Sequence, residues 1–155
     1  MGLVDMTTRY KKEIHRLAKA FGIKLSPRRS HDSWEWDGKT IATNSWKRPH
    51  GDIIHDIAHW IVADEDRRCL PDFGIGEGVN SGKPAGIIIA NPDDEESVAS
   101  VLGILIERQL GMPSWRYTYK YHSWNTWPPT EFLKWKNIVR AHGLTGPGGR
   151  LIFPS

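Results

Sequence analysis

The sequence has little cysteine, no long apolar run and no large excess of either charge. Its single cysteine, Cys69, has no partner within the chain, so we expect a reducing compartment such as the cytoplasm. The longest apolar run, residues 85–90, is far too short to cross a bilayer, and no apolar signal segment stands near residue 1, so no membrane association is expected. The net charge of +3 permits an anionic partner without requiring one, and the composition does not favour nucleic acid.

What the sequence contains is typical of one globular domain. A chain of 155 residues with 39% apolar and 25% charged residues can bury a core of its own. Its eight tryptophans indicate a compact core or an aromatic-lined groove. We expect a single domain over residues 1–155, in which the glycine-rich residues 143–155 form an irregular, loosely held extension.

The chain carries both helix and strand signals. Thr7 or Thr8 is expected to cap a first helix that Gly22 ends. Asp37-Gly38 predicts a hairpin turn between residues 34–36 and 39–44. The other expected elements are a helix after Pro49, a buried strand at 87–89, a helix from Asn91-Pro92 to about Gly111, a strand at 115–121 and a helix near 130–142.

Two histidines four residues apart form the most informative motif. In His55-Asp56-Ile57-Ala58-His59, this spacing places both imidazoles on one face of a helix, where one metal ion can bridge them. The rest of the helix is largely apolar, so we expect it to be buried with its polar sector facing a cavity. Zincin metalloenzymes carry H-E-x-x-H, with the glutamate as general base. Asp56, one methylene shorter, stands at that position here.

A catalytic metal site needs a third protein ligand, and Glu96 is our candidate. The residues that share its helix face, Ala99, Ser100 and Gly103, are small, so a second helix could approach closely there. From spacing alone, Glu96 could equally be one of several acids that complement the dipole of the helix N-terminus. The reserve ligands are Glu95, Glu77 and Asp72.

Further motifs follow the histidines at fixed offsets. In order they are Trp60, the pair Arg67-Arg68, Asp72-Phe73-Gly74, Glu96 near the start of a helix, and Gly111-Met112-Pro113. This pattern resembles the core of the bacterial elongation factor P hydroxylases, over about residues 54–113. The sequence departs from that family by Asp56 in place of glutamate, and by Ile75-Gly76-Glu77-Gly78 in place of an aromatic run.

The resemblance implies a zincin-like α+β domain, in which a small sheet or hairpin packs on the histidine helix and a second helix supplies Glu96. It implies one divalent metal ion, iron or zinc, held by His55, His59 and Glu96. It also implies hydroxylation of a protein or peptide side chain. Because the aromatic run is replaced, we do not infer elongation factor P itself as the substrate.

The role of Asp56 depends on the reaction. In a hydrolase, Asp56 would be the base that takes a proton from a water activated by the metal. In an oxygenase, two histidines and a carboxylate suit iron, and Asp56 would deliver protons. The shorter acid fits the second role better, because a misplacement of about 1 Å can cost roughly a hundredfold in rate. The alternatives are a small zinc metallopeptidase and a catalytically decayed metal-binding or interaction module.

Four further side chains are expected near the site. Asp72 or Asp52 could accept a hydrogen bond from the second ring nitrogen of a ligating histidine, although Asp72 could equally cap amides in its own loop. Arg67 and Arg68 could clamp an acidic substrate group or complement a helix end.

The aromatic and basic residues at 115–122 could stack on nucleic-acid bases, but a strand with its rings packed on one side explains them better.

Overall fold

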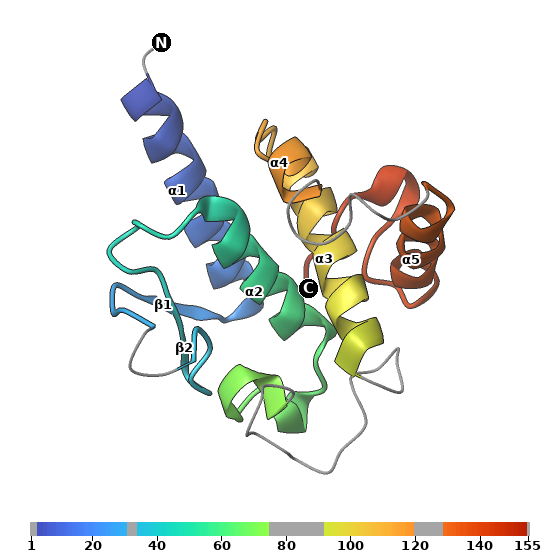
Figure 1. Cartoon of the computed structure of the whole chain (residues 1–155), viewed down its shortest axis with the longest axis horizontal. Helices are drawn as coiled ribbons and strands as arrows, with labels where there is room; N and C mark the ends of the chain where they lie inside the picture. Colours follow the sequence, from blue (N-terminus) through green and yellow to red (C-terminus); the bar gives the residue numbers. More distant parts are fainter. Residues whose placement is uncertain (1–2, 31–33, 75–91, 120–128, 155) are drawn as a thin grey trace.

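The structure, a computed structural model, describes residues 3–30, 34–74, 92–119 and 129–154 (Figure 1). It is helix-rich with one two-stranded parallel sheet, which is compatible with the expected α+β class. The elements are α1 Leu3–Phe21, β1 Lys24–Ser26, β2 Thr40–Ala42, α2 His50–Val62, the 3-10 helices η1 Glu65–Arg67 and η2 Pro71–Gly74, α3 Pro92–Gln109, α4 Trp115–Tyr119, α5 Pro129–Ala141 and the 3-10 helix η4 Pro147–Gly149. None of the described helices is long and apolar enough to cross a membrane.

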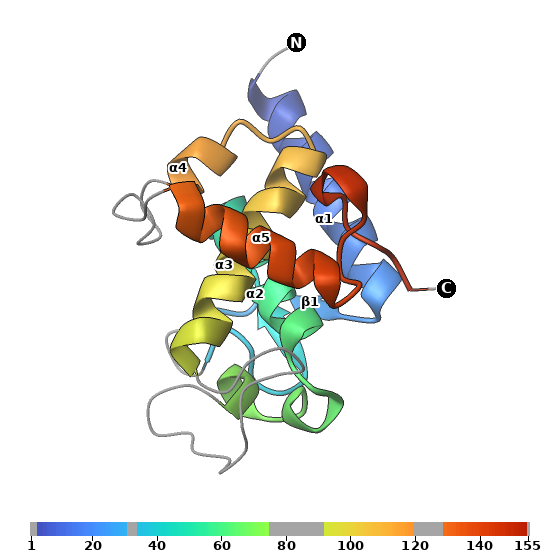
Figure 2. The ribbon, with the colours of Figure 1, turned by 90° about the vertical axis from the view of Figure 1, so that its right-hand side faces the viewer.

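Helix α2 lies at the centre, between α1 and α3, and α5 packs on another side of α3 (Figures 1 and 2). Ile53 and Ile57 of α2 share one core with Ile14 of α1 and Leu102 of α3, and all four are 0% exposed. Apolar residues three and four apart on each helix supply these buried stripes.

The approach of α3 to α2 is close at Gly103. A Cβ built on Gly103 would lie 3.6 Å from the His55 Cα and 3.9 Å from the Ala58 Cβ. The small residues on the Glu96 face predict such an approach, and it sets α3 directly beside the first histidine.

The sheet differs from the expected hairpin. Strand β1 pairs in parallel with β2, with Leu25 opposite Ile41. The segment before the Asp37-Gly38 turn contributes only one antiparallel bridge in the described chain, between Trp36 and Ile41. The N–H of Ala42 also donates to the carbonyl oxygen of Glu35 at 2.8 Å, so the hairpin is confirmed in part, although residues 34–36 do not form a regular strand. The guanidinium of Arg28 binds the carbonyl oxygens of Trp34 and Glu35 as well, at 3.2 and 3.0 Å.

The turn itself forms where the sequence predicts it. Asp37 Oδ1 accepts the backbone N–H groups of Lys39 and Thr40, at 2.9 and 2.8 Å. Gly38 has a φ of +96°, and a Cβ there would lie 2.6 Å from the carbonyl oxygen of Cys69. Glycine is therefore needed both for the backbone angle and for the close approach of the 69 loop.

The first helix is longer than expected. It begins at Leu3, so Thr7 and Thr8 lie inside it, and the prediction that either one caps it was wrong. The residues before the threonines continue the helix because none of them is a strong helix breaker. Gly22, with a φ of +75°, follows the last helical residue as predicted. Helix α3 begins at Pro92, as the Asn-Pro signal predicts.

The strand expected at 115–121 is wrong for its described part, because Trp115–Tyr119 forms the short helix α4. Residues four apart share a helix face, so an alternation over so few residues fits a helix as well as a strand. The ring of Tyr119 packs 5.6 Å from that of Phe132 on α5. Helix α5 confirms the helix predicted near 130–142, and the strand predicted at 87–89 lies outside the described residues.

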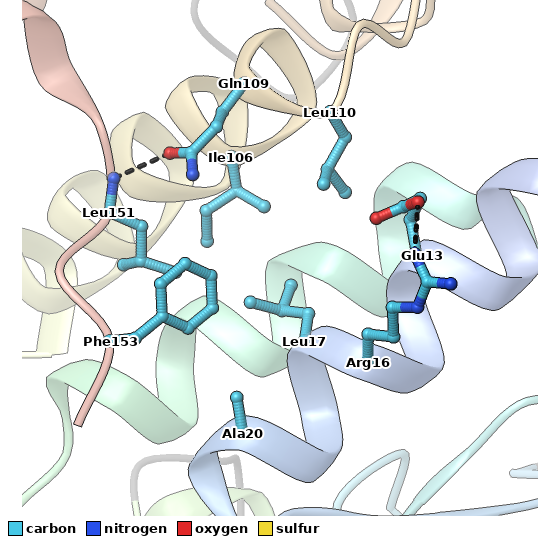
Figure 3. A pocket seen from close by; sticks show the side chains of 9 residues that line it. All are labelled: Glu13, Arg16, Leu17, Ala20, Ile106, Gln109, Leu110, Leu151 and Phe153. Carbon is cyan, nitrogen blue, oxygen red and sulfur yellow. Dashed lines mark hydrogen bonds and ion pairs between the residues drawn. The ribbon is translucent and has the colours of Figure 1, made fainter. Parts of the chain in front are cut away.

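The C-terminal segment is irregular, as expected, but part of it packs against the helices rather than being loosely held. Thr145 and Leu151 form an antiparallel bridge around η4. The backbone N–H of Leu151 donates to Gln109 Oε1 at 2.7 Å (Figure 3). Leu151 is buried and, together with Phe153, lines a hollow of about 390 Å³ between α1 and α3. The glycines that favoured a loose extension lie in tight turns.

Candidate metal centre

The histidine helix α2 is oriented by its apolar residues. Ile53, Ile54 and Ile57 are fully buried. Helical geometry then places the sector of His55 and His59 opposite the N-terminal part of α3. Glu96 comes from that part of α3.

The two imidazoles and the Glu96 carboxylate meet at their ligand atoms. His55 Nε2 lies 2.7 Å from Glu96 Oε1, and His59 Nε2 lies 2.8 Å from Glu96 Oε2. The two Nε2 atoms are 3.1 Å apart. One ligand atom from each residue lies within 4.8 Å of the other two, so the group could hold a metal ion. The structure thus brings together the three residues predicted as ligands.

The size of the cluster fits a small divalent ion. Bonds of about 2.0–2.2 Å in tetrahedral geometry separate ligand atoms by roughly 3.3 Å. The three side chains would therefore need to move apart by less than about 1 Å. The side chains of His55 and His59 are 15% and 6% exposed, whereas that of Glu96 is 45% exposed. The cluster is thus enclosed on the α2 side and accessible on the Glu96 side, where a further ligand can reach it.

The charges of the cluster are strongly coupled. Burial alone would raise the pKa of Glu96, but hydrogen bonds from His55 and His59 hold it well below its usual range. Burial alone would lower the pKa of His59, but the Glu96 carboxylate raises it above its ordinary value. Without metal, the Glu96 carboxylate therefore favours the protonated form of His59 as its positively charged partner. A divalent cation would take over that role and release the proton.

His59 is held by a stack of aromatic rings. Its imidazole lies 5.7 Å from the ring of Phe73, at an interplanar angle of 15°. Phe73 in turn stacks on Trp36 at 5.4 Å and 3°. His59 Nδ1 is buried without a hydrogen-bond partner in the described chain. Packing against the Phe73 ring, rather than a hydrogen bond to Nδ1, therefore orients this imidazole. Sequence reasoning missed the stack, although Asp72-Phe73-Gly74 had marked Phe73.

Asp56 is bound by an arginine that the sequence analysis did not single out. Asp56 Oδ2 accepts a hydrogen bond from Arg48 Nη2 at 2.8 Å, and both side chains are largely buried. Arg48 Nη1 also donates to the carbonyl oxygen of Ala42 at 2.7 Å, which ties β2 to α2. Burial raises the pKa of Asp56, and the Arg48 guanidinium opposes this rise. No local sequence pattern links positions 48 and 56, because Arg48 lies in the loop before α2.

The two aspartates expected near the histidines lie at opposite ends of the site. Asp52 lies in the first turn of α2, where its carbonyl oxygen accepts from Arg48 Nη2 at 3.4 Å. Asp72 lies in η2 in a left-handed conformation, with a φ of +47°. Burial raises the pKa of Asp72 to about 6, against the opposing influence of His59. The structure therefore puts Asp72 within electrostatic range of the cluster.

The two arginines are engaged by the protein itself. Arg67 is 0% exposed, and its Nη2 binds Glu95 Oε1 at 2.7 Å. Arg68 Nε donates to the carbonyl oxygen of Trp60 at 2.8 Å, and its guanidinium lies 3.7 Å from the Trp60 ring centroid. Glu95, a reserve ligand, thus faces away from the cluster, and Glu77 lies outside the described residues.

The hollow in Figure 3 is separate from the metal cluster. It reaches α3 at Ile106, Gln109 and Leu110, which are at least ten residues, or about 15 Å of helix, beyond Glu96. No protein-family model, curated protein or solved structure matches the chain.

Proposed function

We propose that the chain is a metal-dependent enzyme, hydroxylase-like in type, that acts on a side chain of a protein or peptide. The observation that carries the proposal is the convergence of His55 Nε2, His59 Nε2 and both oxygens of Glu96 within hydrogen-bonding distances. The motif resemblance to the elongation factor P hydroxylases supports it, and with it a zincin-like arrangement of the histidine helix.

One feature favours iron and oxygen chemistry over hydrolysis, since the ligand set alone does not decide. Two histidines and one carboxylate form the ligand set of non-haem iron oxygenases, which keep positions open for oxygen and substrate, and also that of some zinc peptidases. The ion pair with Arg48 occupies one oxygen of the Asp56 carboxylate and fixes its orientation. A carboxylate oriented by the arginine is not free to turn toward a metal-bound water, as the general base of a metallopeptidase must be.

In this proposal each of the residues has a separate role. His55, His59 and Glu96 would hold iron, which when bound activates dioxygen. The accessible side of Glu96 admits the substrate. Hydroxylation inserts one oxygen atom of O2 into a C–H bond, and the other leaves as water. Two protons and two electrons from an external small-molecule or protein reductant complete the balance, and Asp56 with Arg48 is placed to hold a proton near the site.

Metal content and nitric oxide binding test the proposal without knowledge of the substrate. Protein purified without added metal would be analysed for iron and zinc, then loaded anaerobically with Fe²⁺ and exposed to nitric oxide. We expect about one iron per chain and the electron paramagnetic resonance signal of a ferrous nitrosyl, because the site keeps an open position. His55→Ala and Glu96→Ala should lose both. His50→Ala, which removes another histidine of α2, should keep them.

The remaining outcomes decide between the alternatives. Tightly bound zinc with peptidase activity in the absence of oxygen would support the metallopeptidase. Oxygen uptake with reductant and candidate peptides would support the hydroxylase. A protein that binds metal without turnover, and gains turnover in Asp56→Glu, would support a decayed site. A protein that binds neither ion would overturn the proposal.

A further inference from the structure

Arg67 contacts both segments that support the metal cluster. Its Nη2 binds Glu95 Oε1 at 2.7 Å, and its Nη1 donates to the carbonyl oxygen of Phe73 at 3.0 Å. Arg67 and Glu95 are 0% exposed, and Phe73 is 0% exposed as well. The guanidinium thus joins the end of η1 to η2 and to the first turns of α3.

The first branch leads to Glu96. Glu95 precedes Glu96 on α3, so a fixed Glu95 side chain fixes the rotation of the helix about its axis. Successive residues on an α-helix point about 100° apart. When Glu95 faces Arg67 in the core, Glu96 therefore faces the histidines, at 2.7 and 2.8 Å from their Nε2 atoms.

The second branch leads to His59. Asp72, Phe73 and Gly74 have φ values of +47°, +57° and +75°, so this turn is left-handed and unfavourable for its two non-glycine residues. The Arg67–Phe73 hydrogen bond and a bond from the Asp72 N–H to the Trp36 carbonyl oxygen, 2.8 Å, hold it. These two hydrogen bonds keep the Phe73 ring stacked on the imidazole of His59, with the ring centroids 5.7 Å apart.

The buried pair is poorly explained as a stabilising contact alone. Arg67 Nε and Glu95 Oε2 are buried without hydrogen-bond partners in the described chain. Burying two charges is costly, and apolar residues of similar volume are often as stable or more stable at such positions. Ion pairs of this kind are retained in some proteins because they specify one arrangement.

We propose that Arg67 is a positioning residue of the metal centre, which sets Glu96 through Glu95 and His59 through Phe73. This inference rests on the proposed metal site. It assigns Arg67 to the interior of the protein rather than to a substrate clamp. In most metalloproteins, a hydrogen bond to the second ring nitrogen orients a ligating histidine. Here the Phe73 ring does so.

The test compares metal binding with stability in two variants. Arg67→Met/Glu95→Met removes both charges at similar volume, and Phe73→Leu removes the ring but keeps the ion pair. We expect Zn²⁺ affinity to fall roughly 10–100-fold in each, the range for loss of residues that orient metal ligands. We also expect the visible spectrum of the Co²⁺-loaded protein to change, because its bands depend on ligand geometry. Stability in urea should stay near that of the wild type in the double variant.

A matched control separates positioning from general destabilisation. Val139 lies in α5 and is 0% exposed, and α5 carries none of the three ligands. Val139→Ala therefore opens a cavity in the core away from the candidate metal cluster. It should lower stability and leave the Co²⁺ spectrum unchanged. If it alters the spectrum as the test variants do, positioning is overturned.

The remaining outcomes of these measurements also test the inference. Unchanged affinity and spectrum in both test variants would overturn the inference, and a change in Phe73→Leu alone would overturn the role of Arg67. If the double variant does not fold, Arg67→Lys, which keeps the charge but not the fork of N–H groups, replaces it under the same criteria. A wild type that binds neither Zn²⁺ nor Co²⁺ through His55 and His59 would overturn the proposed function, and the positioning role with it.

Discussion

Arg48 and Asp56 form a largely buried ion pair of 2.8 Å, and Asp56 is the residue that follows the first of the two histidines in the candidate metal cluster. The guanidinium also binds the backbone of β2 at Ala42. The acid of the histidine motif therefore helps to attach the sheet to α2 through Arg48.

Removal of Arg48 should destabilise the protein strongly. Arg48→Met leaves the Asp56 carboxylate buried without its partner, and such losses cost about 3–5 kcal/mol. Arg48→Met/Asp56→Leu, which removes both charges, should recover most of that loss. Urea unfolding of the two variants and of Asp56→Leu forms a double-mutant cycle. Additive effects would show that the pair is not coupled.

Metal binding should stabilise the fold. A ligand at about 100 times its dissociation constant adds about 2.7 kcal/mol to the free energy of unfolding. Zn²⁺ or anaerobic Fe²⁺ should therefore raise the melting temperature, and a chelator should reverse the rise. His50→Ala should respond like the wild type. An equal rise in Glu96→Ala would show that the ions bind elsewhere.

The close approach of α3 to α2 limits the size of the side chain that position 103 can carry. A methyl group would meet His55 Cα at 3.6 Å, which is an ordinary contact. Gly103→Ala should therefore keep metal affinity and add up to about 1 kcal/mol of stability through helix propensity. Gly103→Leu should push α3 away from α2 and weaken Zn²⁺ binding. Competition titrations with a chromophoric chelator measure both, and equal affinity in the two variants would contradict the prediction.

Asp72 should make the stability of the metal-free protein depend on pH. Its pKa is raised to about 6, chiefly by burial. The protonated form is thus favoured in the folded state, so its stabilising contribution is complete below the unfolded pKa of about 3.9. That contribution is lost as the pH rises through 6. Asp72→Asn cannot ionise and suits a positive φ.

Urea unfolding between pH 5 and pH 8, with chelator present, checks this prediction. Asp72→Asn should gain stability relative to the wild type as the pH rises, and the difference should level off above the pKa of Asp72. Asp66→Asn, an exposed aspartate in η1, is the control for the loss of one carboxylate. A difference that does not change with pH would contradict the assigned pKa.

The C-terminal segment should contribute to stability but not to metal binding. Leu151 is 6% exposed, and Leu151→Ala should cost about 2 kcal/mol, the lower end for such substitutions, because the adjoining hollow is open on one side. Phe153, 47% exposed in the same hollow, should cost less when replaced by alanine (Figure 3). Thermal unfolding ranks the two variants. A loss of Zn²⁺ affinity in Leu151→Ala would show that the hollow and the metal site are linked.

Local spacing was enough to predict the histidine pair, but it left the role of Glu96 open, and the motif resemblance selected Glu96 as the third residue of the cluster. The four-residue step between His55 and His59 fixes a shared face, and the small residues that accompany Glu96 allow the second helix to approach. Both signals lie within single helices, and helical periodicity carries them. For the same reason, α2, α3 and α5 are placed well by the sequence.

Contacts between distant segments were not predictable in this way. Arg48 with Asp56 and Arg67 with Glu95 depend on how loops fold back on the helices, and each arginine alone is typical of a solvated surface. The parallel pairing of β1 with β2 has no local signature over three residues. The alternation at 115–119 was read with the period of a strand, although tertiary packing of Tyr119 on α5 selects a helix.

The adjacent glutamates of α3 limit which insertions and deletions this helix can tolerate. Glu95 and Glu96 sit next to each other, yet one neutralises an interior cation and the other faces two imidazoles. Inserting or deleting a single residue between them and Val98, where α3 enters the core, would rotate both glutamates by about 100° relative to the rest of the helix and turn them from their partners. Such a change would disrupt the cluster with the histidines and leave the charge of Arg67 unpaired in the core, so only changes of about one full turn would preserve both contacts.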